Sequence, residues 1–419
     1  MSAPDGAHAA AHRRTLEVYE RGASDWRDRR AASTDEAVGF AASLGPEDRP
    51  VVDLGAGPGW HSGALGPGTI ALDAAAAMLA LTGEHAPGAR RVRADLAALP
   101  FARGSLGAAW ASKSYVHLAR TELPMAWWDL HRALRPGAPV HLRVFAGDDE
   151  LSTYEHDDFA GRSFSGWPPE LLDHVLVGAG FEVVERGEGD EGRAPLRDGD
   201  ALVRRLRRRR TLADTVGPDL RLLLVGLNPS LRAADAGVGF VTPGNRAWPA
   251  LLSAGLATRD RDPLDLLHRH RIGMTDLVKR ATARADELDP SEYRGGLARL
   301  EALCAWLRPA AVCIVGLSGW RVAVDRRAVA GVQERRLGGR PVYLMPNPSG
   351  LNAHVTVDSL ADHLRAAAQL ADEGAQPADK GAQLADEAAQ LADEGAQPAD
   401  EGAQPADEGA RLADGPADE

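Results

Sequence analysis

Cysteine is scarce in this sequence, with only Cys304 and Cys313 among 419 residues. Two cysteines cannot ligate a four-cysteine iron–sulfur cluster or a zinc ribbon, and so few thiols are typical of the reducing cytoplasm. The sequence also lacks any run of about 18 apolar residues, so neither a membrane-spanning helix nor a membrane partner is expected. No apolar stretch follows the charged residues near the N-terminus, which argues against a secretory signal. We therefore predict a cytoplasmic protein.

Charge is distributed unevenly along the chain. Residues 1–200 carry 20 basic and 30 acidic side chains, residues 201–369 carry 26 and 16, and residues 370–419 carry 2 and 14. A cationic segment between two anionic ones predicts a polyanionic partner for the middle of the chain. The length of 419 residues predicts two or three domains.

The C-terminal sequence repeats a seven-residue unit, with copies such as LADEGAQ and PADEGAQ from Leu370 onward. A coiled coil is excluded because only one weakly apolar position recurs per unit, proline often occupies it, and glycine interrupts nearly every copy. We predict a disordered acidic tail over residues 367–419. It is either a solubilising segment or a nucleic-acid mimic that competes for the cationic segment.

Upstream of the tail, strand and helix patterns alternate in two runs. Apolar strands without polar alternation, separated by helices, predict parallel sheets that are covered on both faces. The expected class is α/β, with two domains in series at residues 1–206 and 220–366 and a basic linker at residues 207–219. The strand-like segments are 51–56, 69–74, 91–95, 106–112, 139–145, 181–186 and 201–206 in the first run, and 221–228, 311–317 and 341–350 in the second.

A run of arginines, RRLRRRR at residues 204–210, lies where the two domains should meet. One interpretation is the solvated end of a strand followed by the linker. The other is contact with phosphate.

A glycine-rich turn, DLGAGPG at residues 53–59, follows the first strand. Glycine lets the backbone bend sharply and approach a ligand closely. The turn lacks Gly-Lys-Ser/Thr, which excludes a phosphate P-loop, and Trp60 breaks the dinucleotide pattern. Asp73 ends the next strand, where a carboxylate can accept hydrogen bonds from both hydroxyls of a ribose.

The combination of DLGAGPG, LDAAAAML and ADLAALPF resembles the class I S-adenosylmethionine-dependent methyltransferases over residues 40–206. The resemblance implies a Rossmann-like sheet with S-adenosylmethionine as the cofactor. A domain that has lost its cofactor is the alternative. The positions that match the family's cofactor contacts are Asp53, Gly55 and Gly57 at the methionine end, Asp73 at the ribose, and Asp95 with Leu96 at the adenine.

The methyl acceptor stays open between a small molecule and an unknown target. Residues 110–115 lack the Asp/Asn-Pro-Pro-aromatic signature of enzymes that methylate exocyclic base amines, and neither cysteine lies in this domain to act as a cytosine-C5 nucleophile. Tyr115 and His117 are either a base or positioning group, or packed residues.

Three motifs in the second domain occur in a fixed order: GLNPS at 226–230, GF at 239–240 followed by PGNRAW at 243–248, and PNPSGLN at 346–352. Together they resemble the mismatch-specific uracil-DNA glycosylase family, which includes the thymine-DNA glycosylases, over about residues 220–366. This region is almost the whole cationic segment. DNA binding requires neutralisation of phosphates, so the charge pattern and the motifs agree.

The resemblance implies hydrolysis of the N-glycosidic bond of uracil, or of thymine or etheno-cytosine, opposite guanine in double-stranded DNA, as a step of base excision repair. Asn228 would position the attacking water, since an amide can orient water but hardly deprotonate it. Phe240 would stack on the extruded base, and Ser230 would lie beside the base pocket.

The last motif would act on the helix itself. Leu351 matches the wedge pushed into the duplex where the base was, and Gly350 and Asn352 would face the partner base. The glycosylase needs no cofactor by this resemblance, and no metal site is expected.

The sequence departs from the family pattern at two positions. Ser230 stands where glycine is commonest, and Ala247 replaces an aromatic residue. In addition, Asn347 stands where the broader uracil glycosylases have a histidine. The range of accepted bases is therefore open, and a lower rate on plain uracil is expected. Two alternatives are a non-catalytic mismatch-binding module and a methyltransferase that the second domain delivers to nucleic acid.

Overall fold

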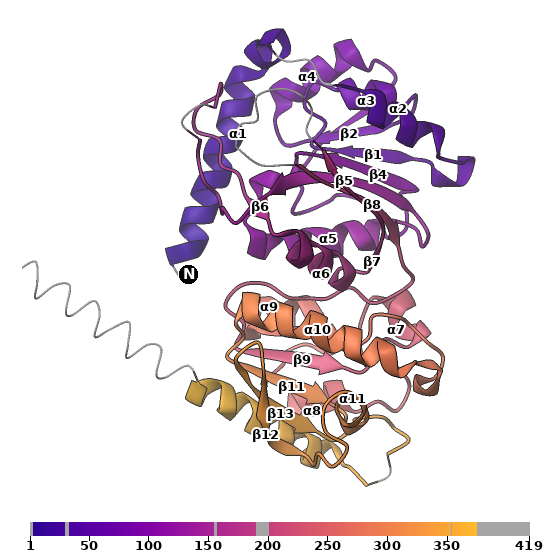
Figure 1. The fold of residues 1–419 in the computed structure, drawn as a ribbon, viewed down its shortest axis with the longest axis vertical. Coiled ribbons are helices and arrows are strands. Elements are labelled where there is room, and N and C mark those ends of the chain that lie inside the picture. Colours follow the sequence, from indigo (N-terminus) through magenta and orange to yellow (C-terminus); the bar gives the residue numbers. More distant parts are fainter. Residues whose placement is uncertain (1–2, 30–32, 155–156, 190–200, 353, 375–419) are drawn as a thin grey trace, which may run out of the picture. The chain divides into compact units, whose positions relative to one another are not determined.

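The computed structural model describes residues 3–29, 33–154, 157–189, 201–352 and 354–374, and contains two separate β-sheets with flanking helices (Figure 1). The predicted α/β class with two sheets in series is confirmed. The part of the predicted tail beyond residue 374 lies outside the described residues. Within the described ranges, no helix combines the length and the apolar character needed to cross a bilayer.

The first sheet has the strand order β3-β2-β1-β4-β5-β8-β7, with the short β6 paired to β5. Strands β1 to β5 run parallel, and the order changes direction between β1 and β4. Loops at the carboxyl ends of strands beside such a reversal form the usual ligand crevice of an open α/β sheet. The strands are β1 Val51–Leu54, β2 Ile70–Asp73, β3 Arg90–Arg93, β4 Ala108–Ser112, β5 Pro139–Ala146, β6 Gly166–Trp167, β7 Phe181–Gly189 and β8 Ala201–Arg208.

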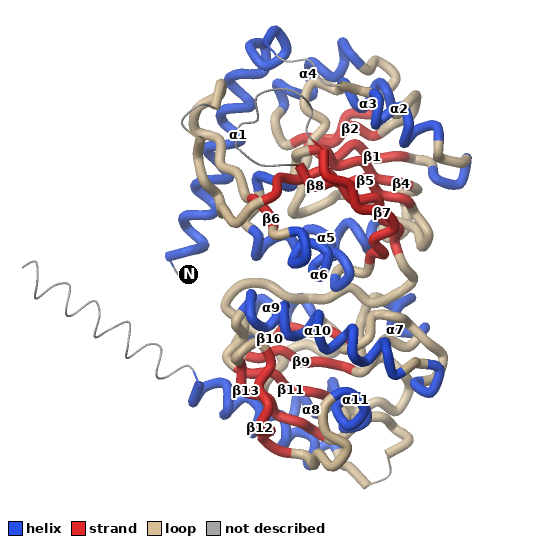
Figure 2. The backbone as a smooth tube through the Cα atoms, viewed as in Figure 1, coloured by secondary structure: helices blue, strands red, loops and turns tan. Residues whose placement is uncertain are grey.

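Helices cover both faces of the first sheet (Figure 2). Successive residues of β1 point to opposite faces, so Val52 packs in the core that includes Trp127 and Leu176, whereas Val51 packs with Phe40. The helices of this half are α1 Ala3–Arg29, α2 Asp35–Ala42, α3 Trp60–Ala64, α4 Ala76–His85, α5 Leu123–Ala133 and α6 Pro169–Gly178, with short 3₁₀ turns at Pro46–Asp48, Tyr115–His117 and Arg120–Glu122.

The second sheet has the order β10-β9-β11-β13-β12. Leu223 of β9 packs in one core with Leu300, and Leu224 packs in another with Trp248 and Leu364, so this sheet is also covered on both faces. Its strands are β9 Leu222–Gly226, β10 Ile272–Asp276, β11 Ala311–Val315, β12 Gly331–Leu337 and β13 Arg340–Met345. Its helices are α7 Leu231–Ala236, α8 Ala247–Ser253, α9 Pro263–His270, α10 Pro290–Leu307, α11 Leu317–Ala323 and residues 357–374, with a 3₁₀ turn at Ala285–Glu287.

The expectation of wholly parallel sheets is wrong at the sheet edges. β8 pairs antiparallel with β5 and β7, and β12 pairs antiparallel with β13. A parallel pair needs a crossover of a dozen or more residues, usually a helix. Only residues 190–200 join β7 to β8, and only residues 338–339 join β12 to β13. Short connections therefore account for the antiparallel β7–β8 and β12–β13 pairs, which an apolar pattern alone does not predict.

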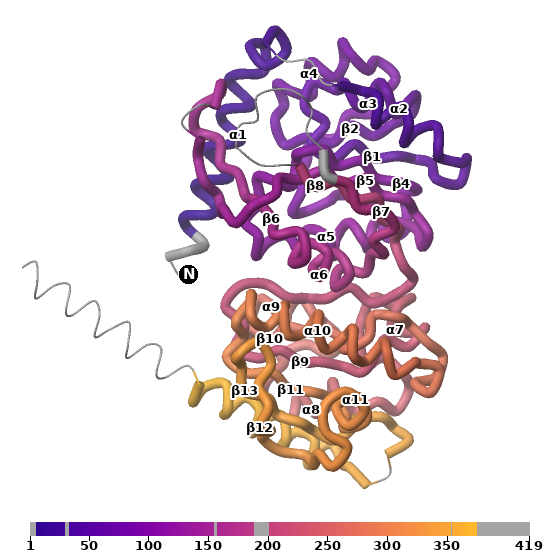
Figure 3. Tube along the Cα trace, viewed as in Figure 1, coloured from indigo at the N-terminus to yellow at the C-terminus, as the bar shows by residue number. Residues whose placement is uncertain are grey.

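The segment expected to be a basic linker is largely built into the fold, as the chain trace shows (Figure 3). β8 continues to Arg208, and Thr215 exchanges two backbone hydrogen bonds of 2.9 Å with Met274 of β10. The expected boundary at residue 366 falls inside the last helix, where Ala367 and Ala371 are fully buried. Both expected boundaries rest on charge and composition. Neither property shows whether a residue is buried in the fold.

Asp214 is the main anchor of this joining segment. Its Oδ1 accepts hydrogen bonds of 2.6 Å from Lys279 Nζ and Thr275 Oγ1, and its Oδ2 accepts one of 2.8 Å from Arg299 Nη1. Its backbone N–H donates to the carbonyl of Gly178 at the end of α6. Burial alone would raise the pKa of Asp214, but Lys279 and Arg299 outweigh burial and hold that pKa below its ordinary value.

Candidate functional site

The glycine-rich turn after β1 adopts a backbone that side chains disfavour. Gly55, Gly57 and Gly59 have φ values of 69°, 54° and 89°. A Cβ on Gly55 would lie 2.4 Å from the Cβ of Ser114, so that glycine is required by packing. A Cβ on Gly57 would meet no atom within 4 Å, so open space lies beside this part of the turn. The backbone at Gly57 can therefore be approached closely by a ligand.

Two carboxylates frame the turn. Asp53 is buried at the end of β1 and accepts a 2.6 Å hydrogen bond from Ser62 Oγ. Asp73 accepts one of 2.8 Å from the N–H of Gly57 and one of 2.9 Å from the N–H of Ala75. Burial raises the pKa of both carboxyls. A carboxylate offers about four acceptor positions, so Asp73 retains capacity for the two hydroxyls of a ribose.

Asp95 already has a partner from α1. His12 Nε2 lies 3.1 Å from Asp95 Oδ2, and the N–H of Ala97 donates to Oδ1 at 2.9 Å. The hydrogen bond from His12 lowers the pKa of Asp95, and the same contact raises the pKa of His12. The N-terminal helix therefore reaches the position that the resemblance assigns to the adenine.

The two uncertain residues after β4 differ in their surroundings. Tyr115 is fully buried, and no described residue forms a hydrogen bond with its hydroxyl, so it serves packing. His117 Nδ1 lies 2.8 Å from the Ser163 carbonyl and Nε2 lies 2.8 Å from the hydroxyl of Tyr19. Burial lowers the pKa of His117 to about 4. The neutral ring therefore donates from Nδ1 to Ser163 and accepts at Nε2 from Tyr19.

In the second half, Asn228 follows the carboxyl end of β9. Its Nδ2 donates to Thr282 Oγ1 at 2.8 Å and to the carbonyl of Arg280 at 3.0 Å. These two bonds use both protons of the amide nitrogen, so Oδ1 is the atom left to accept a hydrogen bond from water or substrate. Ser230 caps α7 by accepting from the N–H of Ala233 at 3.1 Å. Its hydroxyl is thus fixed two residues from Asn228.

Phe240 and Asp276 meet over Gly226, the last residue of β9. A Cβ built on Gly226 would lie 2.4 Å from Asp276 Oδ1 and 3.6 Å from Phe240 Cζ, so only glycine fits there. Phe240 is half-buried and has a φ of 57°, a conformation that bulky residues rarely adopt. Asp276 is buried at the end of β10, and burial raises its pKa to about 6. Lys279 Nζ lies 4.0 Å from its Oδ2.

The PNPSGLN loop after β13 presents Leu351 to solvent, with a relative exposure of 97%. Arg246, just before α8, holds this loop through hydrogen bonds to the carbonyls of Ser349 at 3.1 Å and Asn352 at 2.9 Å. A Cβ on Gly350 would lie 2.8 Å from the carbonyl oxygen of Gly244, so the two loops pack backbone to backbone. The loop is thus held at Ser349 and Asn352 while Leu351 between them is exposed.

The sequence prediction missed three residues that the structure places at these sites. Asp276 lies on a strand that the sequence does not predict, and the TDLVKR segment around it has no distinctive pattern. Tyr19 and His12 lie on α1, and only tertiary contacts bring them to His117 and Asp95. Within the described ranges, no three His, Cys, Asp or Glu side chains gather in a way that could hold a metal ion.

Family models match both halves of the chain. Residues 213–371 match the model of the uracil DNA glycosylase superfamily, and residues 51–137 match a methyltransferase domain.

Solved structures similar to the chain include several methyltransferases. An S-adenosylmethionine-dependent methyltransferase of Methanosarcina mazei is 16% identical, with 41% of this chain and 97% of that chain covered and a TM-score of 0.37. The 1,6-didemethyltoxoflavin-N1-methyltransferase of Burkholderia thailandensis, solved with 1,6-didemethyltoxoflavin and S-adenosylhomocysteine, is 22% identical, with 50% and 92% covered and a TM-score of 0.40. An S-adenosylmethionine-dependent methyltransferase of Mesorhizobium loti is 20% identical, with 42% and 100% covered and a TM-score of 0.32.

The motifs, the two separate sheets and the matched ranges agree, and the chain therefore carries a uracil DNA glycosylase superfamily domain at residues 213–371 and a methyltransferase domain at residues 51–137.

Proposed function

We propose that the C-terminal domain excises a mispaired or damaged pyrimidine, uracil in the first instance, from double-stranded DNA as a step of base excision repair. The observation that carries the proposal is the state of the Asn228 amide. Its nitrogen is fully used by Thr282 and the Arg280 carbonyl, which leaves its oxygen as the atom that can accept a hydrogen bond. An acceptor held in place can orient a water molecule toward the sugar carbon without removing its proton beforehand.

Phe240 and Leu351 supply the two parts of base extrusion. The ring of Phe240 is half-buried, with its tip near Gly226, and we assign it the stacking on an extruded pyrimidine. Stacking of this kind contributes about 1 to 3 kcal/mol per base. The exposed Leu351 would fill the gap left in the duplex, and Gly350 and Asn352 would lie against the unpaired partner base.

Asp276 adds a charge that the motif comparison did not supply. Its carboxyl lies beside Phe240 at the Gly226 wall, and N-glycosidic cleavage places positive charge on the sugar. An ionised carboxylate in a buried site stabilises developing positive charge more strongly than it would in water. With a pKa of about 6, Asp276 is mostly ionised at neutral pH. We assign it the stabilisation of the cationic sugar, with water orientation assigned to Asn228.

The test is single-turnover excision by the full chain on duplexes that carry uracil, thymine or etheno-cytosine opposite guanine. The wild-type protein should produce abasic sites on at least the uracil duplex. Asn228→Ala should lose most of the excision rate while it keeps nearly all of the DNA affinity, because the side chain acts on water in the transition state.

Gln333→Ala, which removes an amide from the edge strand β12, is the matched control and should excise like wild type. Binding without abasic sites in the wild-type protein would instead favour a non-catalytic mismatch-binding module.

For the N-terminal domain we infer S-adenosylmethionine binding and methyl transfer to an acceptor that the residues do not specify. The support is the open face of the glycine turn at Gly57 together with the spare acceptor capacity of Asp73. The Tyr19–His117 pair, with its ring tautomer fixed by the Ser163 carbonyl, is the candidate positioning group on this side of the sheet. Calorimetry of the full chain with S-adenosylmethionine tests the binding, and the absence of heat would indicate a vestigial site.

A further inference from the structure

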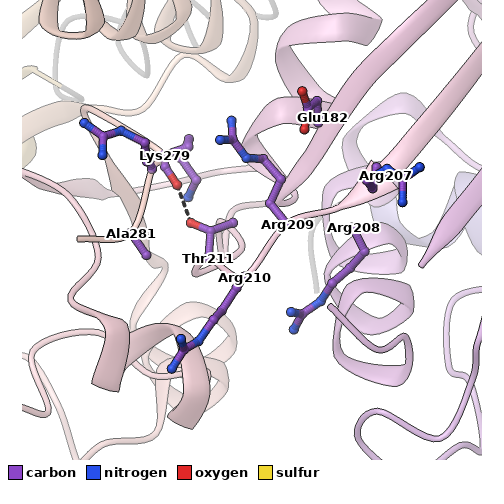
Figure 4. A pocket seen from close by; sticks show the side chains of 9 residues that line it. Glu182, Arg207, Arg208, Arg209, Arg210, Thr211, Lys279 and Ala281 are labelled. Carbon is purple, nitrogen blue, oxygen red and sulfur yellow. Dashed lines mark hydrogen bonds between the residues drawn. The ribbon is translucent and has the colours of Figure 1, made fainter. Parts of the chain in front are cut away.

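Four consecutive arginines, Arg207–Arg210, leave the end of β8 and line a cavity of about 290 Å³ (Figure 4). Lys279 and Arg280 form its other cationic wall, and Glu182 is the one acidic residue among the described residues that line it. In Figure 4, Arg209 extends on the same side of the chain as Glu182, whereas Arg208 and Arg210 point the other way. Six of the nine residues that line the cavity are therefore basic and one is acidic, and Arg209 is the labelled arginine that extends toward Glu182.

Half of these cations already have acidic partners. The pairs are Lys279 with Asp214 at 2.6 Å, Arg280 with Glu292 at 2.8 Å and Arg210 with Asp235 at 2.6 Å. Arg207, Arg208 and Arg209 have no ion pair with any described residue. Arg207 and Arg208 donate only to backbone carbonyls, of Gly137 and His131 respectively. Three guanidinium groups therefore remain without a counter-charge of their own.

Arg208 shows what this arrangement costs. Its side chain is buried, with a relative exposure of 5%, and burial together with the nearby Arg103 lowers its pKa to about 10. A buried guanidinium is ordinarily paired with an anion. The arginine run therefore carries more positive charge than the described acidic side chains around it pair with.

The cavity shares a wall with the candidate glycosylase site. The carbonyl of Arg280 accepts the hydrogen bond from Asn228 Nδ2, and Thr211 Oγ1 donates to the carbonyl of Lys279. Ala281 lines the cavity, and the next residue, Thr282, is the second partner of Asn228. The segment 279–282 therefore has the arginines on one side and the Asn228 amide on the other.

We propose that the cavity lined by Arg207 and Arg209 binds a backbone phosphate of the DNA whose base the C-terminal domain excises, so that the last strand of the methyltransferase half extends the DNA interface. The proposal rests on the glycosylase function proposed above. Guanidinium groups match phosphate oxygens in a two-pronged geometry. Among the residues that line the cavity none is aromatic, so it suits a phosphate rather than a stacked base.

The test measures binding of the full chain to a fully paired duplex over about 50 to 200 mM salt. Each phosphate that the protein neutralises contributes about −0.9 to the slope of log affinity against log salt concentration. The double variant Arg207→Gln/Arg209→Gln should therefore flatten the slope by about 0.9 for each phosphate that is no longer neutralised, and it should bind severalfold more weakly at low salt. Both side chains are exposed, and circular dichroism would verify that the variant is folded.

The matched control is Arg13→Gln/Arg14→Gln, which removes the same charge from an exposed part of α1 and should leave the slope unchanged. Lysines at positions 207 and 209 should restore most of the slope, because the phosphate is still neutralised. An unchanged slope in the glutamine variant overturns the proposal, as does an equal loss in the control. The variant could also lose binding of inorganic phosphate without any change in the salt slope of DNA binding. The cavity would then be a small-anion site, and the proposal would again be overturned.

The wild-type protein could fail to excise any base while the salt slope of its DNA binding still depends on Arg207 and Arg209. That result would contradict the glycosylase function and still support the phosphate site. The two proposals can therefore fail separately.

Discussion

Replacing Asp276 with asparagine should stabilise the protein and slow excision at neutral pH. Burial raises the pKa of this carboxyl from 3.8 to about 6. A tenfold change in an ionisation constant corresponds to about 1.4 kcal/mol, so the ionised carboxylate costs the folded state about 3 kcal/mol above pH 6. Asparagine has nearly the same shape and does not ionise. Asp276→Asn should therefore recover up to about 3 kcal/mol of the free energy of unfolding.

The pH determines whether the wild type and Asp276→Asn differ in the free energy of unfolding. Well below the unfolded pKa of 3.8 the carboxyl is protonated in both the folded and the unfolded chain, so wild type and Asp276→Asn should be equally stable. As pH rises from 3.8 to about 6, the unfolded chain releases the proton while the folded chain still holds it, and the wild type loses stability relative to the variant. Above that pH the difference should stay constant.

The assay is urea unfolding at several pH values, followed by hydrogen exchange in peptides from β9 and β10, because a two-domain chain has no single unfolding midpoint. Excision of uracil by wild type should rise through about pH 6, and the Asp276→Asn profile should be lower and flat. Asp362→Asn, in an exposed pair with Arg365, is the control and should change little. A variant that is less stable than wild type at pH 7 would refute the reasoning, since a buried charge would then be helping the fold.

Three further predictions concern the other sites. Leu351→Ala should impair excision most for uracil paired with adenine and least in single-stranded DNA, where no unpairing cost exists; equal loss on both substrates would exclude a wedge. Asp73→Ala should weaken S-adenosylmethionine binding by the full chain more than Asp95→Ala does, because the ribose hydroxyls lose their acceptor; calorimetry giving the reverse order would contradict the assignment. Deletion of residues 375–419 should tighten non-specific DNA binding at low salt and lose that effect as salt rises, and unchanged low-salt affinity would leave only a solubilising role for the tail.

The tail deletion begins at residue 375 because described residues close to that point still contribute to the fold. Ala371 is fully buried, and Asp372 Oδ2 forms a 2.7 Å ion pair with Arg221 Nη2. The heptad repeat begins at Leu370, so the repeat alone would have suggested a cut that removes both of these residues.

The motifs whose backbone conformation depends on neighbouring residues could be predicted from the sequence. The turn at Gly55–Gly59 and the Asn228–Ser230 segment each follow an apolar strand, and the chemistry of their residues fixes what the backbone does there. The strands that carry them, β1 and β9, lie at nearly the positions that the sequence predicts. Short-range patterns contain this information because it depends on neighbouring residues only.

Other features depend on contacts between distant residues. The sequence does not predict β12, because it is a charged edge strand. Glu334, Arg335 and Arg336 are all exposed. β10 includes Gly273, Thr275 and Asp276, yet all five of its residues are buried, and the Thr275 hydroxyl is satisfied by Asp214 and Arg299 from elsewhere. Asp276 was missed for the same reason. Its role follows from burial beside Phe240, which no local pattern reports.

Asp214 links the two halves through its side chain and its backbone. Its carboxylate neutralises Lys279 and Arg299 of the glycosylase half, while its backbone is fixed to Gly178 at the end of a methyltransferase helix, where a Cβ would lie 2.4 Å from Asp214 Oδ2. A change at either position therefore disturbs a salt bridge in one half and helix packing in the other.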